Sequence, residues 1–540
     1  MLIIIFSWIY LFVVIFLVGR LFLNDKLLSF LRLDKKFEWY EYFWAGLFFV
    51  FGSLQVWSIF LPINIVPILA FSALAFISLI ISFRKGLNLP KKINFRFLVI
   101  LVFGLFILSY YASQQTGAPD TMGYHLNAVK WLSTYSTVPG LANLHSRLGF
   151  NTSFFPFAAM SNHLFLQDKV SHVALSFFFA VLFAEISWIL FKPGNRNLKI
   201  FSLFITTGIL AGIVKGGILP SLYYDSVMMV VVFACSLEII KNDIGSLFVS
   251  ALLAILVFSV KLSGVSFSIL VMLFIFYKIF FVFKEITIKR TLALLFPGIF
   301  ILVPYITRNA ILSGWLFYPL PFLRLNFDWT VPGSFVKSVY SITQAWAKVP
   351  GIEYVKYIDS SFWEWFPVWF SRNSNTTELK LLYIGLFVLL ILFVKKFIKK
   401  SKSIDLSNIY FLTLASLISF VYILFTAPDF RFGGMFISVF FASVLILLFS
   451  RFEWNDNLKL MIVIGFLMFT TYLSWPIKIE TEPYLKSLRW DQSLPTKNVN
   501  GILMPIDDSC GNSELPCTPE ENNIRWRIPG NLSKGFAPVR

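Results

Sequence analysis

A polar stretch, Gln114–Phe157, holds the side chains of this chain that are best suited to acid–base chemistry. Its single acid is Asp120, and the four histidines of the chain lie between positions 125 and 172. A carboxylate can take the proton of a hydroxyl, and a nearby cation can stabilise negative charge on a leaving group. The polar residues around Asp120 that could contact a substrate are Tyr124, His125, Lys130, His145, Arg147 and Asn151. We therefore expect the chemistry to centre on Asp120.

A second set of polar residues stands at the ends of apolar runs further along the chain. The set comprises Tyr224, Asp225, Lys261, Arg308, Asn309 and Arg431. Ionisable groups at a bilayer are costly, so they suggest function. Two carboxylates with several cations suit a transfer reaction in which Asp120, with Asp225 secondary, takes a hydroxyl proton while cations hold a departing phosphate. Helix capping by either Asp and snorkelling of Lys261 are the simpler alternatives.

The composition excludes a soluble globular protein. Of the 540 residues, 57% are hydrophobic and only 14% are charged, and the mean hydropathy is +0.76, so this chain must span a membrane many times. The net charge of +18 fits Lys and Arg gathered in cytoplasmic loops, where they set the topology. No nucleic-acid partner is expected.

Fourteen apolar runs predict an all-α polytopic membrane protein. They lie at residues 2–18, 42–60, 65–81, 97–111, 170–191, 201–214, 222–240, 247–260, 265–283, 292–306, 381–394, 409–425, 435–448 and 460–473. Basic clusters at 20–36, 84–96 and 395–402 mark the cytoplasmic side. Both chain termini, the stretch around Asp120 and the segment 309–377 are then expected on the outer face.

We expect three parts in this topology. Residues 1–96 form an N-terminal three-helix segment, residues 97–475 form the core with outer loops at 112–169 and 309–377, and residues 476–540 form an outer tail. Cys510 and Cys517 stand close together in this polar tail, which suggests a disulfide on an oxidising side of the membrane. Cys235 lies inside an apolar run and is expected to be inert packing.

Four segments resemble motifs of the GT-C superfamily of integral-membrane glycosyltransferases. PDTMGYHLNAVKWL is similar to the acidic motif of the first outer loop, and SLYYDSVMMVVVFACSLEI is similar to the helix that opens with a second Asp. SVKLSG resembles the Lys-bearing segment two helices on, and RNAILSGWLFYPLP resembles the turn that carries an Arg-Asn pair and Tyr-Pro. The segments VPGLANLHSRLGFN and CTPEENNIRWRIPGNLSKGF also resemble a bacterial group of uncharacterised multi-spanning proteins near that superfamily.

The resemblance covers roughly Phe97–Arg431 and the tail. It implies a GT-C-like core with juxtamembrane helices on its outer face, and it puts Asp120 at the position of the catalytic acid. The first three helices have no counterpart in a minimal core of the superfamily. No acid stands two residues from Asp120, so a metal-binding DxD motif is absent. We predict no metal site from the residues, and a divalent metal cofactor is left open.

The favoured function is that of a glycosyltransferase in a bacterial inner membrane. It would transfer a sugar, with inversion, from a polyprenyl-phosphate-linked donor to a glycan, lipid or protein acceptor at the periplasmic face, in contact with membrane lipids. A polymerase or ligase of lipid-linked glycans is an alternative with the same sidedness. A lipid or glycan transporter is the alternative from another class. It would predict broken helices and a polar site at mid-membrane, whereas the apolar runs here are mostly uninterrupted and the polar residues lie at their ends.

Overall fold

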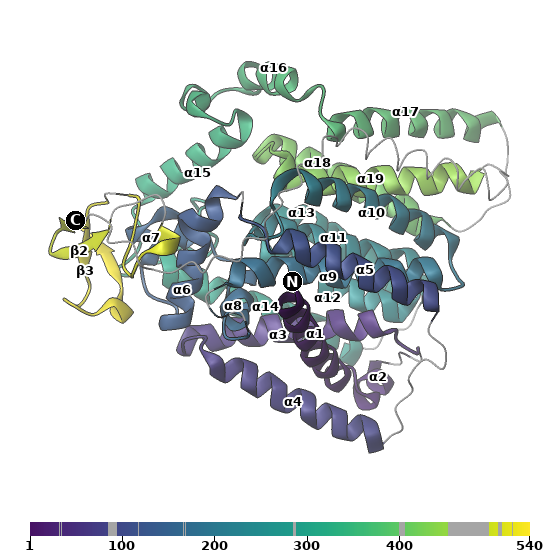
Figure 1. The fold of residues 1–540 in the computed structure, drawn as a ribbon. Coiled ribbons are helices and arrows are strands. Elements are labelled where there is room, and N and C mark those ends of the chain that lie inside the picture. The colour runs from purple at the N-terminus through teal and green to yellow at the C-terminus, as the bar shows by residue number, and fades with distance from the viewer. Residues whose placement is uncertain are drawn as a thin grey trace.

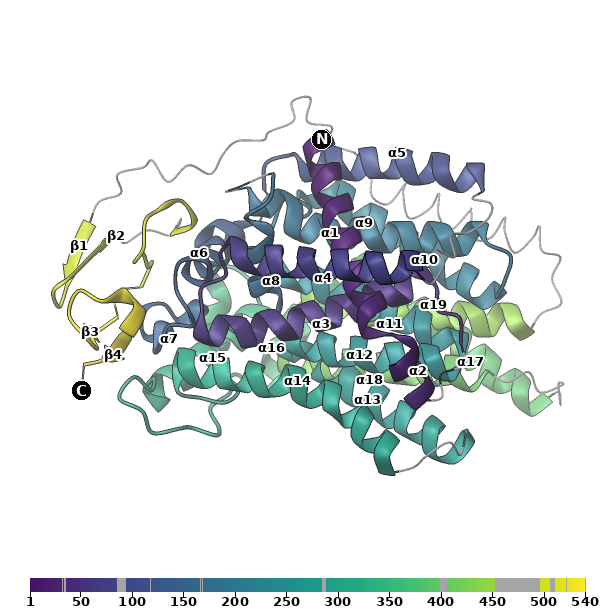
Figure 2. The same ribbon diagram turned by 90° about the horizontal axis from the view of Figure 1, so that it is seen from below.

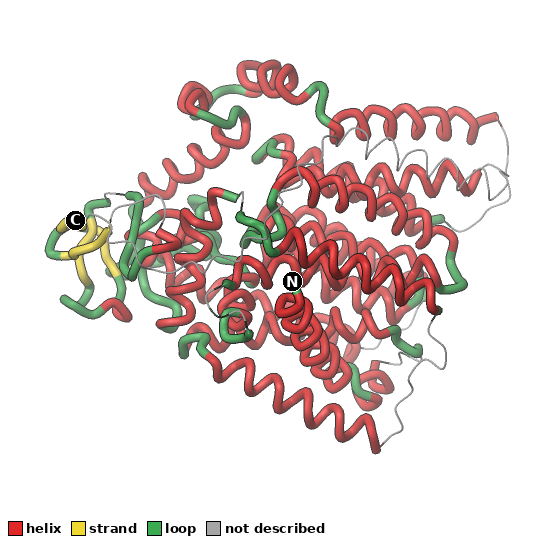
Figure 3. Tube along the Cα trace, in the orientation of Figure 1, coloured by secondary structure: helices red, strands yellow, loops and turns green. Residues whose placement is uncertain are grey.

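The computed structural model describes most of the chain. The described residues are 1–31, 33, 35–84, 94–116, 118–165, 167, 169–283, 288–398, 406–451, 496–505, 510–520 and 522–539. Most of this is helical, and the strands are confined to the C-terminal tail (Figure 3).

The long helices follow the apolar runs. Their bounds are α1 Leu2–Phe22, α3 Trp39–Phe60, α4 Ile65–Arg84, α5 Phe95–Ala112, α9 Val170–Phe191, α10 Arg196–Gly216, α11 Tyr224–Lys241, α12 Ile244–Val260, α13 Val265–Tyr277, α14 Ile288–Ser313, α17 Thr377–Ile398, α18 Ser407–Thr426 and α19 Phe430–Arg451. Shorter helices are α2 Asp25–Leu31, α6 Leu126–Thr134, α7 Leu141–Leu144, α8 Phe154–Ser161, α15 Gly333–Lys348 and α16 Phe362–Asn373. A π-helix, η1, spans Thr121–His125.

Ten of the described helices are long and apolar enough to cross a membrane. The chain is therefore a multi-pass integral membrane protein, as predicted. Thirteen of the fourteen predicted runs coincide with described helices, whereas the run at 460–473 lies outside the described residues. Helices α11 and α12 are not among the ten. Helix α12 has only 17 residues, and α11 carries the charged residues Asp225, Glu238 and Lys241. The count of fourteen spans stays a prediction.

Most of the long helices run side by side, whereas α1 crosses them, and the two ends of the bundle differ (Figures 1 and 2). The short helices α6, α7 and α15 gather at one end together with the strands of the tail. The loop between α9 and α10, residues 192–195, lies at the opposite end. The polar stretch after α5, the segment after α14 and the tail therefore share one end of the bundle.

One buried apolar core runs from α1 to α19 and includes the N-terminal helices. Helices α1 and α3 cross closely at two glycines: a Cβ atom on Gly19 would lie 1.8 Å from the carbonyl oxygen of Tyr42, and one on Gly46 would lie 2.0 Å from that of Ile15. Small residues at such crossings let membrane helices pack tightly. Helix α3 is also tied to α9, because Trp44 Nε1 donates to Glu185 Oε2 at 2.8 Å.

A buried ion network joins α3, α11 and α12 at the end opposite the tail. Lys241 Nζ lies 2.6 Å from Glu238 Oε1 and 3.0 Å from Glu41 Oε1. Lys35 Nζ reaches the same Glu41 oxygen at 2.6 Å and Asp243 at 3.0 Å. Because the side chains of Glu41 and Glu238 are fully buried, these lysines supply the charge compensation that burial requires.

The tail folds into two small hairpins. Strands β1 (Thr496–Val499) and β2 (Ile502–Pro505) pair antiparallel, as do β3 (Ile524–Trp526) and β4 (Phe536–Pro538). The predicted disulfide between Cys510 and Cys517 is confirmed. Cys235 is a free, buried cysteine. The tail is not a detached appendage, because Phe536 N donates to the carbonyl of Pro139 at 3.1 Å.

Cysteine labelling should verify which end of the bundle faces outward. Ser136→Cys, Ser338→Cys and Ser533→Cys sit at the end that holds the tail, and we expect all three to react with a membrane-impermeant thiol reagent in intact cells. Pro193→Cys, exposed between α9 and α10, is the matched control and should react only after the membrane is opened. Labelling of Pro193→Cys alone in intact cells would reverse the predicted topology.

Candidate functional site

Four segments that lie far apart in the sequence bring charged residues together at the tail end of the bundle. Asp120 precedes η1, Asp225 lies in the first turn of α11, Lys261 ends α12, and Arg431 lies in the first turn of α19. Contacts join these residues in two pairs, Asp120 with Arg431 and Asp225 with Lys261. We call this group the outer charge cluster, after the side of the membrane that the sequence predicts for it.

The backbone around Asp120 is held by the segment that precedes α11. Thr121 Oγ1 accepts a hydrogen bond from the backbone N–H of Leu222 at 3.1 Å, and Thr121 itself is fully buried. The Asp120 carboxylate makes no capping hydrogen bond to η1. For Asp120 the capping alternative is therefore wrong in this structure, and its carboxylate is left facing Arg431.

Arg431 lies between two carboxylates. Its Nη1 atom is 3.7 Å from Asp120 Oδ2, and its Nη2 atom is 2.8 Å from Asp429 Oδ2. Arg431 Nε also donates to Asp429 Oδ2 at 2.9 Å. The guanidinium has five N–H donors, so Asp429 fixes its orientation while donors remain for another acceptor.

Lys261 and Asp225 form the second pair. Their ion pair is largely enclosed, with side chains 16% and 13% exposed. Lys261 Nζ also lies 3.4 Å from the centre of the Phe432 ring and 5.1 Å from that of Tyr224, which is cation–π geometry. The aromatic rings hold the ammonium group in place at the edge of the bundle.

Burial shifts the pKa values of Asp120 and Lys261 in this cluster. Burial raises the pKa of the Asp120 carboxyl above its usual value, while Arg431 and Arg147 oppose that shift. Burial lowers the pKa of Lys261, and Asp225 opposes this shift. A raised carboxyl pKa is the direction expected for a general base that must work near neutral pH.

An aromatic wall backs the cluster. The ring of His125 packs 4.3 Å from that of Tyr124, 5.4 Å from that of Tyr224 and 5.3 Å from that of Phe155. His125 is 1% exposed, and neither ring nitrogen has a hydrogen-bond partner among the described residues. Burial lowers the pKa of His125 well below its usual value, so the imidazole is neutral.

Other predicted site residues lie in a second polar group around Tyr305. Asn151 Nδ2 donates to the Tyr305 carbonyl at 2.9 Å, and Asn309 Nδ2 donates to the Leu316 carbonyl at 2.8 Å. Arg308 is 3% exposed and reaches the Thr152 carbonyl at 3.5 Å. A role for Arg308 and Asn309 in substrate binding stays a prediction.

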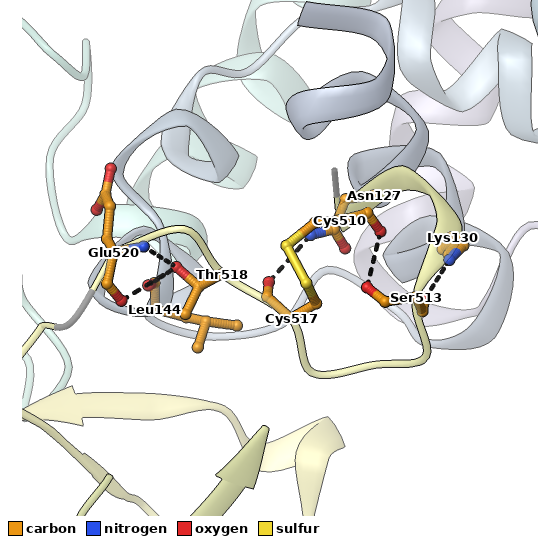
Figure 4. Close-up of a disulfide and its surroundings, with 8 residues drawn as sticks. All are labelled: Asn127, Lys130, Leu144, Cys510, Ser513, Cys517, Thr518 and Glu520. Atoms are coloured by element: carbon orange, nitrogen blue, oxygen red, sulfur yellow. Dashed lines mark hydrogen bonds between the residues drawn. A yellow bond between two sulfur atoms is a disulfide. The ribbon is translucent and has the colours of Figure 1, made fainter. Parts of the chain in front are cut away.

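Three residues predicted to bind substrate have protein partners. Lys130 Nζ donates to the carbonyl of Ser513 in the tail (Figure 4). His145 Nε2 lies 3.6 Å from Glu520 Oε1, and burial lowers the pKa of His145 to about 4, so that it is neutral at pH 7. Arg147 Nη1 lies 3.5 Å from Thr343 Oγ1.

The sequence reasoning missed Phe432, Phe155 and Glu520. Phe432 and Phe155 are two of 64 phenylalanines, so nothing in the sequence distinguished them. In the described part of the chain, no group of three or more His, Cys, Asp or Glu side chains is placed to hold a metal ion.

Residues 1–441 match a family described as a domain of unknown function (DUF8201). The match covers the outer charge cluster and ends inside α19, before the tail. No curated protein and no solved structure matches the chain.

Proposed function

The chain belongs to the family described as a domain of unknown function (DUF8201), and we propose a function from the site itself. The proposed reaction is transfer of a sugar, with inversion, from a polyprenyl-phosphate-linked donor to an acceptor hydroxyl. The observation that carries this proposal is the outer charge cluster: a carboxylate with a raised pKa, 3.7 Å from a guanidinium, beside a second acid–lysine pair.

The chemistry follows from the residues of the cluster. Asp120 accepts the proton of the acceptor hydroxyl as that oxygen forms a bond to the anomeric carbon. The bond from the anomeric carbon to the phosphate oxygen breaks, and the electron pair leaves with the phosphate. Lys261 and Arg431 stabilise the charge on this leaving group. A single displacement at the anomeric carbon inverts its configuration.

Two further carboxylates, those of Asp225 and Asp429, keep Lys261 charged and Arg431 oriented. Burial lowers the pKa of Lys261, and the neighbouring Asp225 counteracts this, which keeps the ammonium group charged. Asp429 orients Arg431 through two contacts, at 2.8 and 2.9 Å. The apolar surface of the helices could hold the lipid tail of the donor, so that its phosphate reaches the bundle end where the cations lie.

Purified full-length protein in lipid provides the direct test. It would be supplied with polyprenyl-phosphate donors that carry labelled sugars and with membrane glycolipid acceptors. Covalent transfer of label to an acceptor supports the proposal. Movement of intact donor across vesicle membranes without covalent transfer would instead support the transporter alternative.

The pH dependence of transfer should reflect Asp120. A general base is active when deprotonated, so kcat/KM is full above the pKa of Asp120 and falls as the pH drops through it. Because burial raises this pKa, the acid limb should lie above the pH at which an ordinary aspartate titrates. Arg147→Gln removes a cation that lowers the pKa, so the limb should move upward. A limb that Arg147→Gln does not move would contradict the assignment.

Loss of a cation should weaken the binding of the carrier. Lys261→Met or Arg431→Met should each reduce the affinity for polyprenyl phosphate roughly 10-fold to 150-fold, since a hydrogen bond to a charged group is worth about 1.5–3 kcal/mol. Arg431→Lys keeps the charge but loses the fork and should fall in between. Lys337→Met, exposed on α15, is the control. Equal affinities for all of these variants in a vesicle-binding assay would exclude this phosphate site.

A further inference from the structure

The C-terminal tail is fastened to the stretch that carries Asp120 (Figure 4). Asn127 Nδ2 donates to the carbonyl of Cys517 at 3.1 Å, and Lys130 Nζ donates to the carbonyl of Ser513. Thr518 Oγ1 donates to the carbonyl of Leu144 at 2.9 Å. Asn127 and both cysteines are fully buried. These contacts form a buried interface between the tail and the stretch that carries Asp120, so this part of the tail is not a loose surface segment.

The disulfide gives this part of the tail its shape. Both acceptors for Asn127 and Lys130 are backbone carbonyls within residues 510–517, the loop that the Cys510–Cys517 bond closes. Closing a loop restricts the conformations of its backbone. The direction of the two carbonyls therefore depends on the closed loop.

Gly511 brings the loop against η1. The short 3-10 helix η6 (Cys510–Asn512) packs on η1. A Cβ atom on Gly511 would lie 2.7 Å from the Met122 carbonyl oxygen and 3.1 Å from the Met122 Cα. The obstacle is backbone, which cannot rotate away as a flexible side chain could. Only glycine allows this approach without a shift of η1 or of the loop.

On the other side, η1 is tied through Thr121 to Leu222, in the segment that precedes α11. The helix is thus held between the tail and the segment before α11, with Asp120 at its N-terminal edge. A π-helix is rare and is often found at functional sites. The distance of 3.7 Å between Asp120 and Arg431 is near the limit of an ion pair, so a small shift of η1 changes the surroundings of the carboxylate.

We infer that the disulfide-closed loop 510–517 is a clamp that positions Asp120, with Gly511 as the residue that sets its distance from η1. The inference rests on the proposed function, because it assigns the tail a part in the same reaction. It also gives the tail, which lies beyond the family match at 1–441, a specific task at the site. Asn127 and Lys130 are then positioning residues rather than substrate ligands.

Gly511→Ala in the full-length protein tests the clamp. Hydrogen exchange of the backbone amides in residues 114–134 should become at least about 10-fold faster, because η1 loses its support from the tail. The rate of sugar transfer should fall roughly 10-fold to 100-fold, as expected for a small misplacement of a catalytic group. If Gly511→Ala does not fold, Cys510→Ser/Cys517→Ser supplies the same two measurements.

Asp328→Asn is the matched control. It removes the charge from the Asp328–Arg527 pair, a contact of the tail with the segment after α14, without touching η1, and should leave exchange and transfer unchanged. A second comparison separates positioning from general damage: in an Asp120→Asn background, Gly511→Ala should cause no further loss of transfer. Equal losses in both backgrounds, or unchanged exchange in residues 114–134, would overturn the clamp.

If the wild-type protein transfers no sugar, the proposed function fails, and the exchange comparison alone decides whether the tail holds η1.

Discussion

Asp120→Asn should lower the rate of sugar transfer roughly 100-fold to 10,000-fold, the range expected for loss of a general base. The amide keeps the shape of the side chain but cannot accept the proton. The carboxylate makes no capping hydrogen bond to η1, and its half-exposed pair with Arg431 contributes little to stability, so the change costs the fold little. Expression and donor binding should therefore stay near those of the wild type. Transfer of labelled sugar by the purified variant in lipid is the measurement.

The same substitution at an unrelated carboxylate provides the control. Asp359 accepts a hydrogen bond from Ser341 at 3.1 Å and is held at a positive φ of 56°, which asparagine tolerates well. Asp359→Asn should leave transfer unchanged. Activity of Asp120→Asn within a few-fold of the wild type would exclude Asp120 as the base and move the search to Asp225.

The helices could be predicted because each apolar run in a bilayer must satisfy its own backbone hydrogen bonds. For example, the run at 170–191 became α9 with the same bounds. Alternation of the chain across the membrane also predicts which helix ends meet. Asp225 and Arg431 open helices, and Lys261 follows one, at the same end of the bundle. Their gathering could thus be predicted without a structure.

The partners of individual side chains could not be predicted in this way. Lys130 and His145 were assigned to substrate because they lie near Asp120 in the sequence, but they contact Ser513 and Glu520, more than 300 residues away. The tail has no hydrophobic periodicity that would reveal where it packs, and its main acceptors are backbone carbonyls. The place of Arg308 beside Thr152 likewise depends on packing that sequence order does not determine.

Lys241→Met should lower the free energy of unfolding by about 3–5 kcal/mol, because it removes one partner from a buried ion network. Methionine has a similar length, so packing changes little. Glu41 keeps Lys35 at 2.6 Å, whereas Glu238 loses the cation that lies 2.6 Å from it. The second carboxylate oxygen of Glu238 has no hydrogen-bond partner among the described residues. Most of the loss therefore comes from Glu238.

Unfolding in mixed micelles with increasing sodium dodecyl sulfate, followed by tryptophan fluorescence, measures this loss. Lys192→Met is the matched control, because the Lys192–Glu38 pair is 47% and 28% exposed, and such pairs contribute at most about 1 kcal/mol. Adding Glu238→Gln to Lys241→Met should restore part of the stability, since a neutral amide leaves no charge in the core. A loss for Lys241→Met no larger than that for Lys192→Met would mean that the buried network contributes no more to stability than an exposed pair.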